Sequence, residues 1–268
     1  LAKTMMVSTL SKILDLKLSR IQFTPDLMPS DITGYDILIE NNGKKSFEFS
    51  KGPVFANIIL ADEINRAPGK TQSALLESMQ EKKVTVSGKT YPLDEPFMVL
   101  ATQNPIEQEG TYNLPEAQLD RFFMQLNIFY PTFEEEKKIA GKILRTDFSM
   151  EKILNAREII QTQQIILDMP VANSIIEYAV RLVADTRPQT TTFDNVKKFV
   201  LWGAGPRASQ FLVLAAKGRA ALAGRYTPSV EDIKYVAKNV LRHRIILNFN
   251  AKSQNISSDD LIENILSE

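Results

Sequence analysis

The run Ile58-Ile59-Leu60-Ala61-Asp62-Glu63 decides how this sequence is interpreted, because a strongly apolar segment ends abruptly in two acids. Its apolar part belongs to a longer, mostly apolar run over residues 54–61, and a second such run follows at residues 97–102. Short, continuously apolar runs are typical of central parallel strands that are covered on both faces. Residues 72–80, between the two runs, have helical apolar periodicity. This strand-helix-strand order predicts a doubly wound α/β sheet, which usually binds its ligand at the carboxyl ends of the strands.

A third apolar run, residues 122–130, is expected to add a strand, after which the pattern becomes helical. From Thr132 onward, apolar residues recur at helical spacing, including a stripe from Val171 to Val183. The aromatic residues of this part are expected in its core: Phe193, Phe199, Trp202 and Phe211. We therefore expect an α/β core over residues 1–131 and a small all-α domain over residues 132–268.

Two β-hairpins are expected as insertions in the α/β core. The first has its turn at Asn42-Gly43, where both residue types tolerate the positive φ angles of a tight turn. The second has its turn at Ser87-Gly88, just before the strand of residues 97–102.

The acids at the end of the first strand point to phosphate chemistry. In nucleotide hydrolases of this type, the first acid holds Mg²⁺ and the second activates the attacking water, which would assign these roles to Asp62 and Glu63. The same two acids would also suit the N-terminus of the following helix.

Three further positions fit this chemistry, and each has an ordinary alternative. Lys3-Thr4 precedes a helix, as at the end of a phosphate-binding loop, although such a dipeptide also occurs without that role. Asn104 follows the second strand and could orient a water molecule, but Asn104-Pro105 also suits a simple turn. Arg121 stands just before the third apolar run, where it could reach a neighbouring subunit or remain on the surface.

Composition excludes several classes of function. The 268 residues include no cysteine and one histidine, which rules out disulfides, zinc fingers and thiol nucleophiles. The formal net charge is zero, with 13 Lys and Arg against 16 Asp and Glu before Pro131 and 19 against 16 after it. Such a balance argues against a dedicated nucleic-acid binder. No apolar stretch is long enough to span a bilayer, and a cytoplasmic protein is expected.

Long stretches of the chain resemble MoxR-type AAA+ ATPases. The resemblance is carried by residues 20–34, 52–68 and 70–77 and by Gly205-Pro206-Arg207-Ala208-Ser209, and it covers nearly the whole sequence. It implies that the two hairpins are the helix-2 insert and the pre-sensor-1 insert of this clade. It also implies the following site residues: Lys3 and Thr4 of the Walker A loop, Asp62 and Glu63 of Walker B, Asn104 as sensor 1, Arg121 as arginine finger and Arg207 as sensor 2. The sequence begins within the Walker A motif, so the first strand and the loop glycines are expected to precede Leu1.

The function implied by this resemblance is Mg²⁺-dependent hydrolysis of ATP by a homo-oligomer, with a hexameric ring expected. Such machines remodel partner proteins in a chaperone-like way, and a client with a von Willebrand A-type domain is the expected partner. A DNA-associated motor and a nucleotide-gated scaffold with little turnover are the alternatives. The hairpin tips, with Lys44 and Lys45 in the first and Lys89 in the second, are weakly basic, which argues against the motor. The intact acidic pair argues against the scaffold.

Three other charged or titratable residues have mainly structural interpretations. We expect His243 to be a packing or capping residue of the helical domain. Arg66 and Arg187 could face a phosphate or a subunit boundary, although arginines usually lie at the surface.

Overall fold

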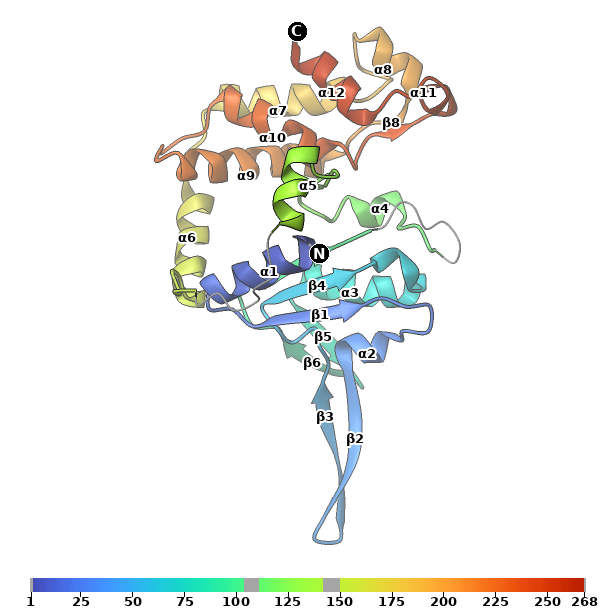
Figure 1. Ribbon diagram of the computed structural model, residues 1–268, viewed down its shortest axis with the longest axis vertical. Helices are drawn as coiled ribbons and strands as arrows, with labels where there is room; N and C mark the ends of the chain where they lie inside the picture. Colours follow the sequence, from blue (N-terminus) through green and yellow to red (C-terminus); the bar gives the residue numbers. More distant parts are fainter. Residues whose placement is uncertain (1, 104–110, 142–149, 268) are drawn as a thin grey trace. The chain divides into compact units, whose positions relative to one another are not determined.

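The computed structural model describes residues 2–103, 111–141 and 150–267, which form two compact units (Figure 1). The first unit comprises Leu1–Pro115 and Ser149–Thr162, and the second comprises Glu116–Phe148 and Gln163–Glu268. An α/β core followed by a helical lid, the fold class expected from the sequence, is confirmed. The domain boundary expected after residue 131 stays a prediction. The compact units change instead after Pro115, because the segment that follows bonds to the helical residues.

The first unit contains most of the strands. Its elements in chain order are α1 (Ala2–Ile13), β1 (Leu18–Gln22), α2 (Pro29–Thr33), β2 (Gly34–Asn41), β3 (Lys44–Lys51), β4 (Ile58–Asp62), the 3-10 helix η1 (Ile64–Arg66), α3 (Gly69–Glu81), β5 (Lys83–Val86), β6 (Lys89–Pro92) and β7 (Met98–Ala101).

The central sheet has the order β1-β4-β7, and both pairs of strands are parallel. The two strands predicted from apolar runs are present, but the first begins at Ile58, because residues 54–57 form turns. Ile58 and Leu60 pack with Val7 of α1, and all three are almost completely buried. Alternation along a strand turns Ile59 toward the opposite face, where it is also buried, so the sheet is covered on both sides. This double burial explains the continuous apolar run.

Both predicted hairpins are confirmed. Strands β2 and β3 pair over eight residues around a turn in which Asn42 and Gly43 have φ angles of 52° and 75°. Figure 1 shows this ribbon projecting from the sheet of its unit. At its base a Cβ atom on Gly34 would lie 2.2 Å from the carbonyl oxygen of Ser50, so only glycine allows this close approach. Strands β5 and β6 form the second hairpin around the turn at Ser87-Gly88.

The second unit is almost wholly helical. Its elements are α4 (Glu116–Leu119), α5 (Phe133–Ala140), α7 (Asn173–Asp185), α8 (Asp194–Phe199), β8 (Val200–Trp202), α9 (Pro206–Leu222), α10 (Val230–Leu241), β9 (Ile246–Leu247), α11 (Phe249–Ser253) and α12 (Ser258–Ser267). Helix α6 (Ala156–Asp168) is divided: it belongs to the first unit up to Thr162 and to the second unit from Gln163.

The core of the second unit is one large apolar cluster formed chiefly by α7, α9, α10 and α12. The predicted stripe of α7 is confirmed, and Phe199 is buried in the same cluster, with Phe193 and Phe211 packed against it. The prediction for Trp202 is wrong, since 62% of its side chain is exposed. Trp202 lies in the short ribbon of β8 and β9, which buries Val200 but leaves the two residues after it outside the core.

The strand predicted over residues 122–130 is also wrong, because these residues adopt no regular secondary structure. The β1-β4-β7 sheet gives them no partner strand among the described residues. Their backbone bonds to the helical unit instead, with the carbonyl oxygen of Phe122 accepting from Arg244. The apolar side chains of Phe129 and Tyr130 are 82% and 88% exposed. The apolar run therefore indicates a propensity to form a strand, but no strand forms in these residues.

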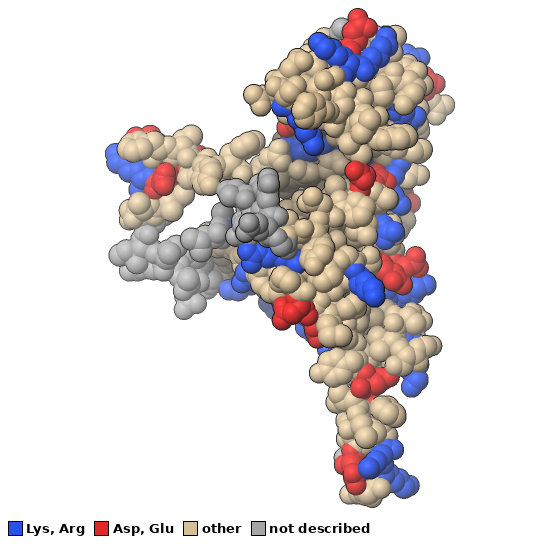
Figure 2. Space-filling view, turned by 90° about the vertical axis from the view of Figure 1, so that its right-hand side faces the viewer, with Lys and Arg blue, Asp and Glu red and all other residues tan. Residues whose placement is uncertain are grey.

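The surface has a mixed chemical character. Figure 2 shows Lys and Arg interspersed with Asp and Glu over the visible face, including the projecting hairpin, in keeping with the zero formal net charge. Of the helices in the described ranges, none combines the length and apolar character needed to cross a membrane.

Candidate active site at the carboxyl edge of the sheet

The parallel strands bring three polar side chains to one edge of the sheet. Gln22 ends β1, Asp62 ends β4, and Thr102 directly follows β7. The hydroxyl of Thr102 donates to Oδ1 of Asp62 at 2.5 Å and accepts from the backbone N–H of Glu63 at 3.0 Å. One threonine therefore fixes both acids relative to the neighbouring strand.

Asp62 is held as a charged carboxylate. Its Oδ2 accepts from Nη2 of Arg20 at 2.6 Å and from Nε of the same guanidinium at 3.2 Å. Partial burial acts to raise the pKa of Asp62. The hydrogen bonds from Thr102 and Arg20, together with the charges of Arg20 and Lys3, outweigh that effect and keep the pKa below its ordinary value. Asp62 is thus ionised at neutral pH, as a ligand of a cation must be.

Glu63 leaves the strand in a left-handed conformation, with φ at 56°. Its Oε2 accepts from Nε2 of Gln22 at 2.9 Å and pairs with Nε of Arg66 at 3.2 Å. Although Glu63 stands at the N-terminus of η1, its side chain makes no capping hydrogen bond to that helix. Glu63 therefore does not cap η1, and its carboxylate is oriented by Gln22 and Arg66 at the sheet edge.

Lys3 and Thr4 lie in the first turn of α1, in the same unit. The charge of Lys3 is among the causes that lower the pKa of Asp62, which relates the start of α1 to the end of β4. Backbone N–H groups and a lysine at a helix N-terminus form a favourable environment for phosphate. Asn104, the expected water-orienting residue, lies outside the described residues.

The donor set at this edge suits Mg²⁺ better than a transition metal. Over the described ranges, no group of three or more His, Asp and Glu side chains comes together in a way that could hold a metal ion. Mg²⁺ typically takes only one or two protein oxygens and completes its shell with water and substrate phosphates. One ionised carboxylate at Asp62 with the hydroxyl of Thr4 fits that mode.

The two predicted arginines, Arg121 and Arg207, lie in the second unit, and both are close to Asp120. Nη1 of Arg207, near the start of α9, donates to Oδ2 of Asp120 at 3.0 Å. Nε of Arg244 donates to Oδ1 of the same carboxylate at 2.9 Å. Arg121 follows Asp120 directly, and its backbone N–H donates to the carbonyl of Gln118 at 3.2 Å.

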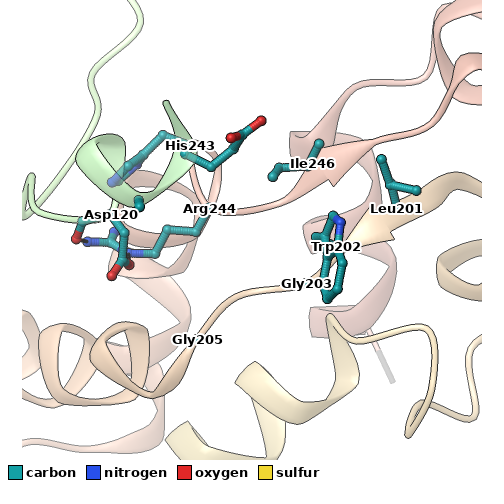
Figure 3. Close-up of a pocket in the computed structure, with 10 residues that line it drawn as sticks. Asp120, Leu201, Trp202, Gly203, Gly205, His243, Arg244 and Ile246 are labelled. Atoms are coloured by element: carbon teal, nitrogen blue, oxygen red, sulfur yellow. Dashed lines mark hydrogen bonds and ion pairs between the residues drawn. The ribbon is translucent and has the colours of Figure 1, made fainter. Parts of the chain in front are cut away.

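A pocket of about 460 Å³ lies beside this cluster in the second unit (Figure 3). Trp202 lies across the pocket from His243 and Asp120. Nε2 of His243 is 3.2 Å from the carbonyl oxygen of Phe122, and its buried Nδ1 has no hydrogen-bond partner among the described atoms. Burial, followed by the charge of Arg244, lowers the pKa of His243 to about 4. His243 is therefore a neutral packing residue at neutral pH, in line with its structural interpretation.

Comparison with known proteins decides the family. A family model described as "ATPase family associated with various cellular activities (AAA)" matches residues 1–124, and an AAA lid domain matches residues 194–265. Chaperone MoxR1 of Mycobacterium tuberculosis is 44% identical over 266 residues, which cover 99% of this chain and 70% of that protein. The chain belongs to the MoxR family of AAA ATPases.

Two further relatives support the MoxR-family assignment. Uncharacterized protein YeaC of Bacillus subtilis is 43% identical over 99% of this chain and 80% of its own length. The crystal structure of a putative ATPase from Cytophaga hutchinsonii matches with a TM-score of 0.90 and 47% identity, covering 100% of this chain and 81% of that one. The resemblance found in the sequence is therefore confirmed, together with the core-and-lid fold.

Several residues that shape this MoxR-family site were not singled out from the sequence. Arg20 and Gln22 sit two residues apart at the end of β1, a spacing that places both on one face of a strand. Thr102 stands in the polar tip that follows the second apolar run. The two other arginines considered have local partners: Arg66 pairs with Glu63, and Nε of Arg187 donates to the carbonyl of Ala204 at 2.9 Å.

Proposed function

We propose that this chain binds ATP with Mg²⁺ at the carboxyl edge of the β1-β4-β7 sheet and hydrolyses it to ADP and phosphate. The observation that carries the proposal is the pair Asp62 and Glu63, held at the end of a buried strand by Thr102. Lys3 binds the β- and γ-phosphates, and Thr4 and Asp62 hold the metal. The metal, when bound, neutralises charge on the phosphates.

Glu63 acts on the attacking water in this proposal. Its carboxylate is oriented by Gln22 and Arg66, so an oxygen that can accept a proton is held at the sheet edge. Asn104, the residue expected to orient water, would hydrogen-bond to the same water. Arg207 would bind phosphate from the lid, and Arg121 would act as the arginine finger of a neighbouring copy.

In this proposal, the free energy of ATP hydrolysis drives the remodelling of other proteins. The printed name of the relative from Mycobacterium tuberculosis, Chaperone MoxR1, supports a chaperone-like role, and membership of the AAA ATPases supports a homo-oligomer, which we propose to be a hexameric ring. A protein with a von Willebrand A-type domain is the proposed client. If this is correct, adding the client protein should raise the rate of ATP hydrolysis. The client itself should not become active when it is mixed with a variant of this chain that cannot hydrolyse ATP.

Replacing the proposed base tests the chemistry. Glu63→Gln keeps the shape of the side chain but cannot take a proton, so hydrolysis should fall by about 100-fold or more while ATP still binds. Steady-state phosphate release and equilibrium binding of ATP measure the two effects. Glu95→Gln is the matched control, because Glu95 is an exposed glutamate of the same unit that pairs with Lys82. Turnover in Glu63→Gln equal to that of the control would reassign the base.

Mixing two inactive proteins tests the site between copies. An arginine finger contributes about 10³ to 10⁵ in rate in other systems, so Arg121→Ala should be nearly inactive alone. Mixed with Glu63→Gln, it should regain turnover wherever the intact Arg121 of one copy meets the intact Glu63 of another. Full activity of Arg121→Ala alone, or no rescue when mixed oligomers are shown to form, contradicts the proposal.

A further inference from the structure

Asp120 in the second unit joins two arginines that differ greatly in their exposure. Its Oδ2 accepts from Arg207 at 3.0 Å, and its Oδ1 accepts from Arg244 at 2.9 Å. The side chain of Arg244 is 1% exposed, whereas that of Arg207 is 39% exposed. Of these two partners of Asp120, only Arg207 is open to a ligand that arrives from solvent.

Arg244 fixes Asp120 and the residues after it. Besides the carboxylate, Nη2 of Arg244 donates to the carbonyl oxygens of Asp120 at 2.9 Å and Phe122 at 2.5 Å. Nη1 reaches the carbonyl of Phe123 at 3.4 Å, and the guanidinium carbon lies 5.0 Å from the ring centroid of Phe211. These contacts hold the segment that contains Arg121 whether or not Arg207 is bound to Asp120.

Arg207 is placed where it can change partners. It is the second residue of α9, directly after Gly205-Pro206. An added Cβ atom at Gly205 would meet nothing within 4 Å, so the backbone before Arg207 borders open space. The pocket of about 460 Å³ is lined by both Gly205 and Asp120, so solvent also reaches the acid of the pair.

We propose that Asp120 is a positioning residue that competes with the phosphates of bound ATP for the guanidinium of Arg207. Asp120 accepts from Nη1 of Arg207, whereas a phosphate carries more negative charge and can accept two hydrogen bonds from one guanidinium, so phosphate wins this competition when ATP is bound. Asp120 holds Arg207 in a defined position before binding and accepts it again when product leaves. Because Arg244 keeps Asp120 in place, Arg121 is not displaced by the exchange. The inference rests on the proposed function, in which Arg207 binds phosphate.

Removing the competing charge should tighten nucleotide binding. Asp120→Asn keeps the size of the side chain, and its amide oxygen can still accept from Arg244. A partly exposed ion pair is weak, so freeing Arg207 should raise the affinity for a fluorescent non-hydrolysable analogue, methylanthraniloyl-AMPPNP with Mg²⁺, by about two- to fivefold. In protein that already contains Arg207→Ala, the same substitution should leave the affinity unchanged, because no guanidinium remains to be freed.

Asp259→Asn provides a matched control. Asp259 is 28% exposed against 30% for Asp120, and it makes a two-pronged ion pair with Arg242, at 3.0 and 2.9 Å, in the same unit. Losing this pair perturbs the unit without touching Arg207, so affinity for the analogue should not change. A merely structural role for Asp120 predicts instead that the two substitutions act alike.

The outcomes separate this inference from the proposed function. If wild-type protein does not bind the analogue, both are overturned. If wild-type protein binds it but Asp120→Asn binds no more tightly, or binds more tightly even without Arg207, only the inference is overturned.

A measurement on wild-type protein covers the case in which Asp120→Asn does not fold. In protein labelled with ¹⁵N-arginine, the side-chain signal of Arg207, assigned by its loss in Arg207→Lys, should shift when the analogue saturates the site. The signal of buried Arg244 should shift much less. An Arg207 signal that stays unmoved at saturation overturns the inference.

Discussion

Asp120 and Asp232 each bridge two arginines in the second unit, yet the two clusters are built differently. Asp232 is completely buried and accepts from Arg219, from both Nη atoms of Arg225 at 2.7 and 2.6 Å, and from the backbone N–H and hydroxyl of Ser229. All three partners lie within 13 residues of it in sequence. The partners of Asp120 are 87 and 124 residues away.

The arginines Arg219 and Arg225 are 36% and 40% exposed, much like Arg207 at 39%, so the difference lies in the carboxylates. The comparison teaches that the exposure of the carboxylate and its spare bonding capacity, rather than the number of charges, decide what such a cluster can do. The hydrogen bond from Arg225 is the largest cause that lowers the pKa of Asp232, and it outweighs burial, which acts in the opposite direction. The Asp232 cluster ties the end of α9 to the start of α10 and leaves no oxygen free for exchange. The Asp120 cluster keeps one partner buried and one accessible, so it can hold a segment and still release an arginine.

The largest effect that this comparison predicts is on stability. Asp232→Asn would turn an amide toward donors that now face a carboxylate, so the free energy of unfolding should fall by about 3 kcal/mol. Asp120→Asn should cost only about 1 kcal/mol, because Asp120 is itself 30% exposed and the amide oxygen of Asn can still accept from Arg244. Urea unfolding can be followed by the fluorescence of Trp202, the one tryptophan of the sequence, which lies in the same unit. Equal losses in the two variants would remove the distinction between the clusters.

A smaller effect follows from His243, which borders the Asp120 cluster and has no counterpart beside Asp232. Its pKa is about 4 in the folded chain and 6.5 ordinarily, so the unfolded chain binds more protons between these values. The contribution of neutral His243 to the free energy of unfolding is therefore fully present above the unfolded pKa. It is lost as pH is lowered, by about 2 kcal/mol between about pH 7.5 and about pH 5. Asp232, whose pKa lies below its ordinary 3.8, adds nothing to the slope in this range.

Urea unfolding of wild-type protein and His243→Gln at a series of pH values measures that slope. The variant should lose less stability on acidification, whatever its stability at neutral pH. Parallel loss in both proteins would mean that the imidazole is not the group responsible.

The smallest stability effect is expected at Arg207. Because its pair with Asp120 is partly exposed, Arg207→Ala should lower the free energy of unfolding by less than about 1 kcal/mol. Nucleotide turnover should nevertheless fall strongly, and the change in X-ray scattering on adding ATP should be lost, if Arg207 links nucleotide to the lid. Unchanged turnover together with an unchanged scattering response would count against that role.

Periodicity was sufficient for the elements whose own apolar pattern or turn residues are diagnostic, even where their partners are distant in sequence. Apolar runs located β4 and β7, the Asn42-Gly43 turn located the first hairpin, and the stripe of α7 located one side of the helical core. The residues 122–130 escaped this reasoning, because a strand also needs a partner with free backbone groups. Their start is bonded instead to Arg244, more than 120 residues away, and nothing local in the sequence indicates that contact.

The position of the acids at the sheet edge could be predicted, because two adjacent acids follow a buried strand. The roles of Arg121 and Arg207 are implied by the resemblance to MoxR-type ATPases and stay predictions. The residues that orient the acids, Arg20, Gln22 and Thr102, come from the two flanking strands, and their roles depend on the strand order of the sheet. Asp120 directly precedes the predicted Arg121, but its link to Arg207 spans 87 residues and could be found only from the fold.

The ribbon of β2 and β3 has a consequence for how relatives of this protein can diverge. Its base is anchored, since Phe49 stacks on Tyr91 with ring centroids 4.2 Å apart. Farther out, Leu38 and the directly opposite Phe47 are 57% and 74% exposed and take no part in either core. Folding therefore places little restraint on the residue types at these positions, as long as the turn and the base persist. Among chains with this fold, the residues of the outer part of the β2-β3 ribbon can therefore be substituted in evolution while the acids at the sheet edge stay the same.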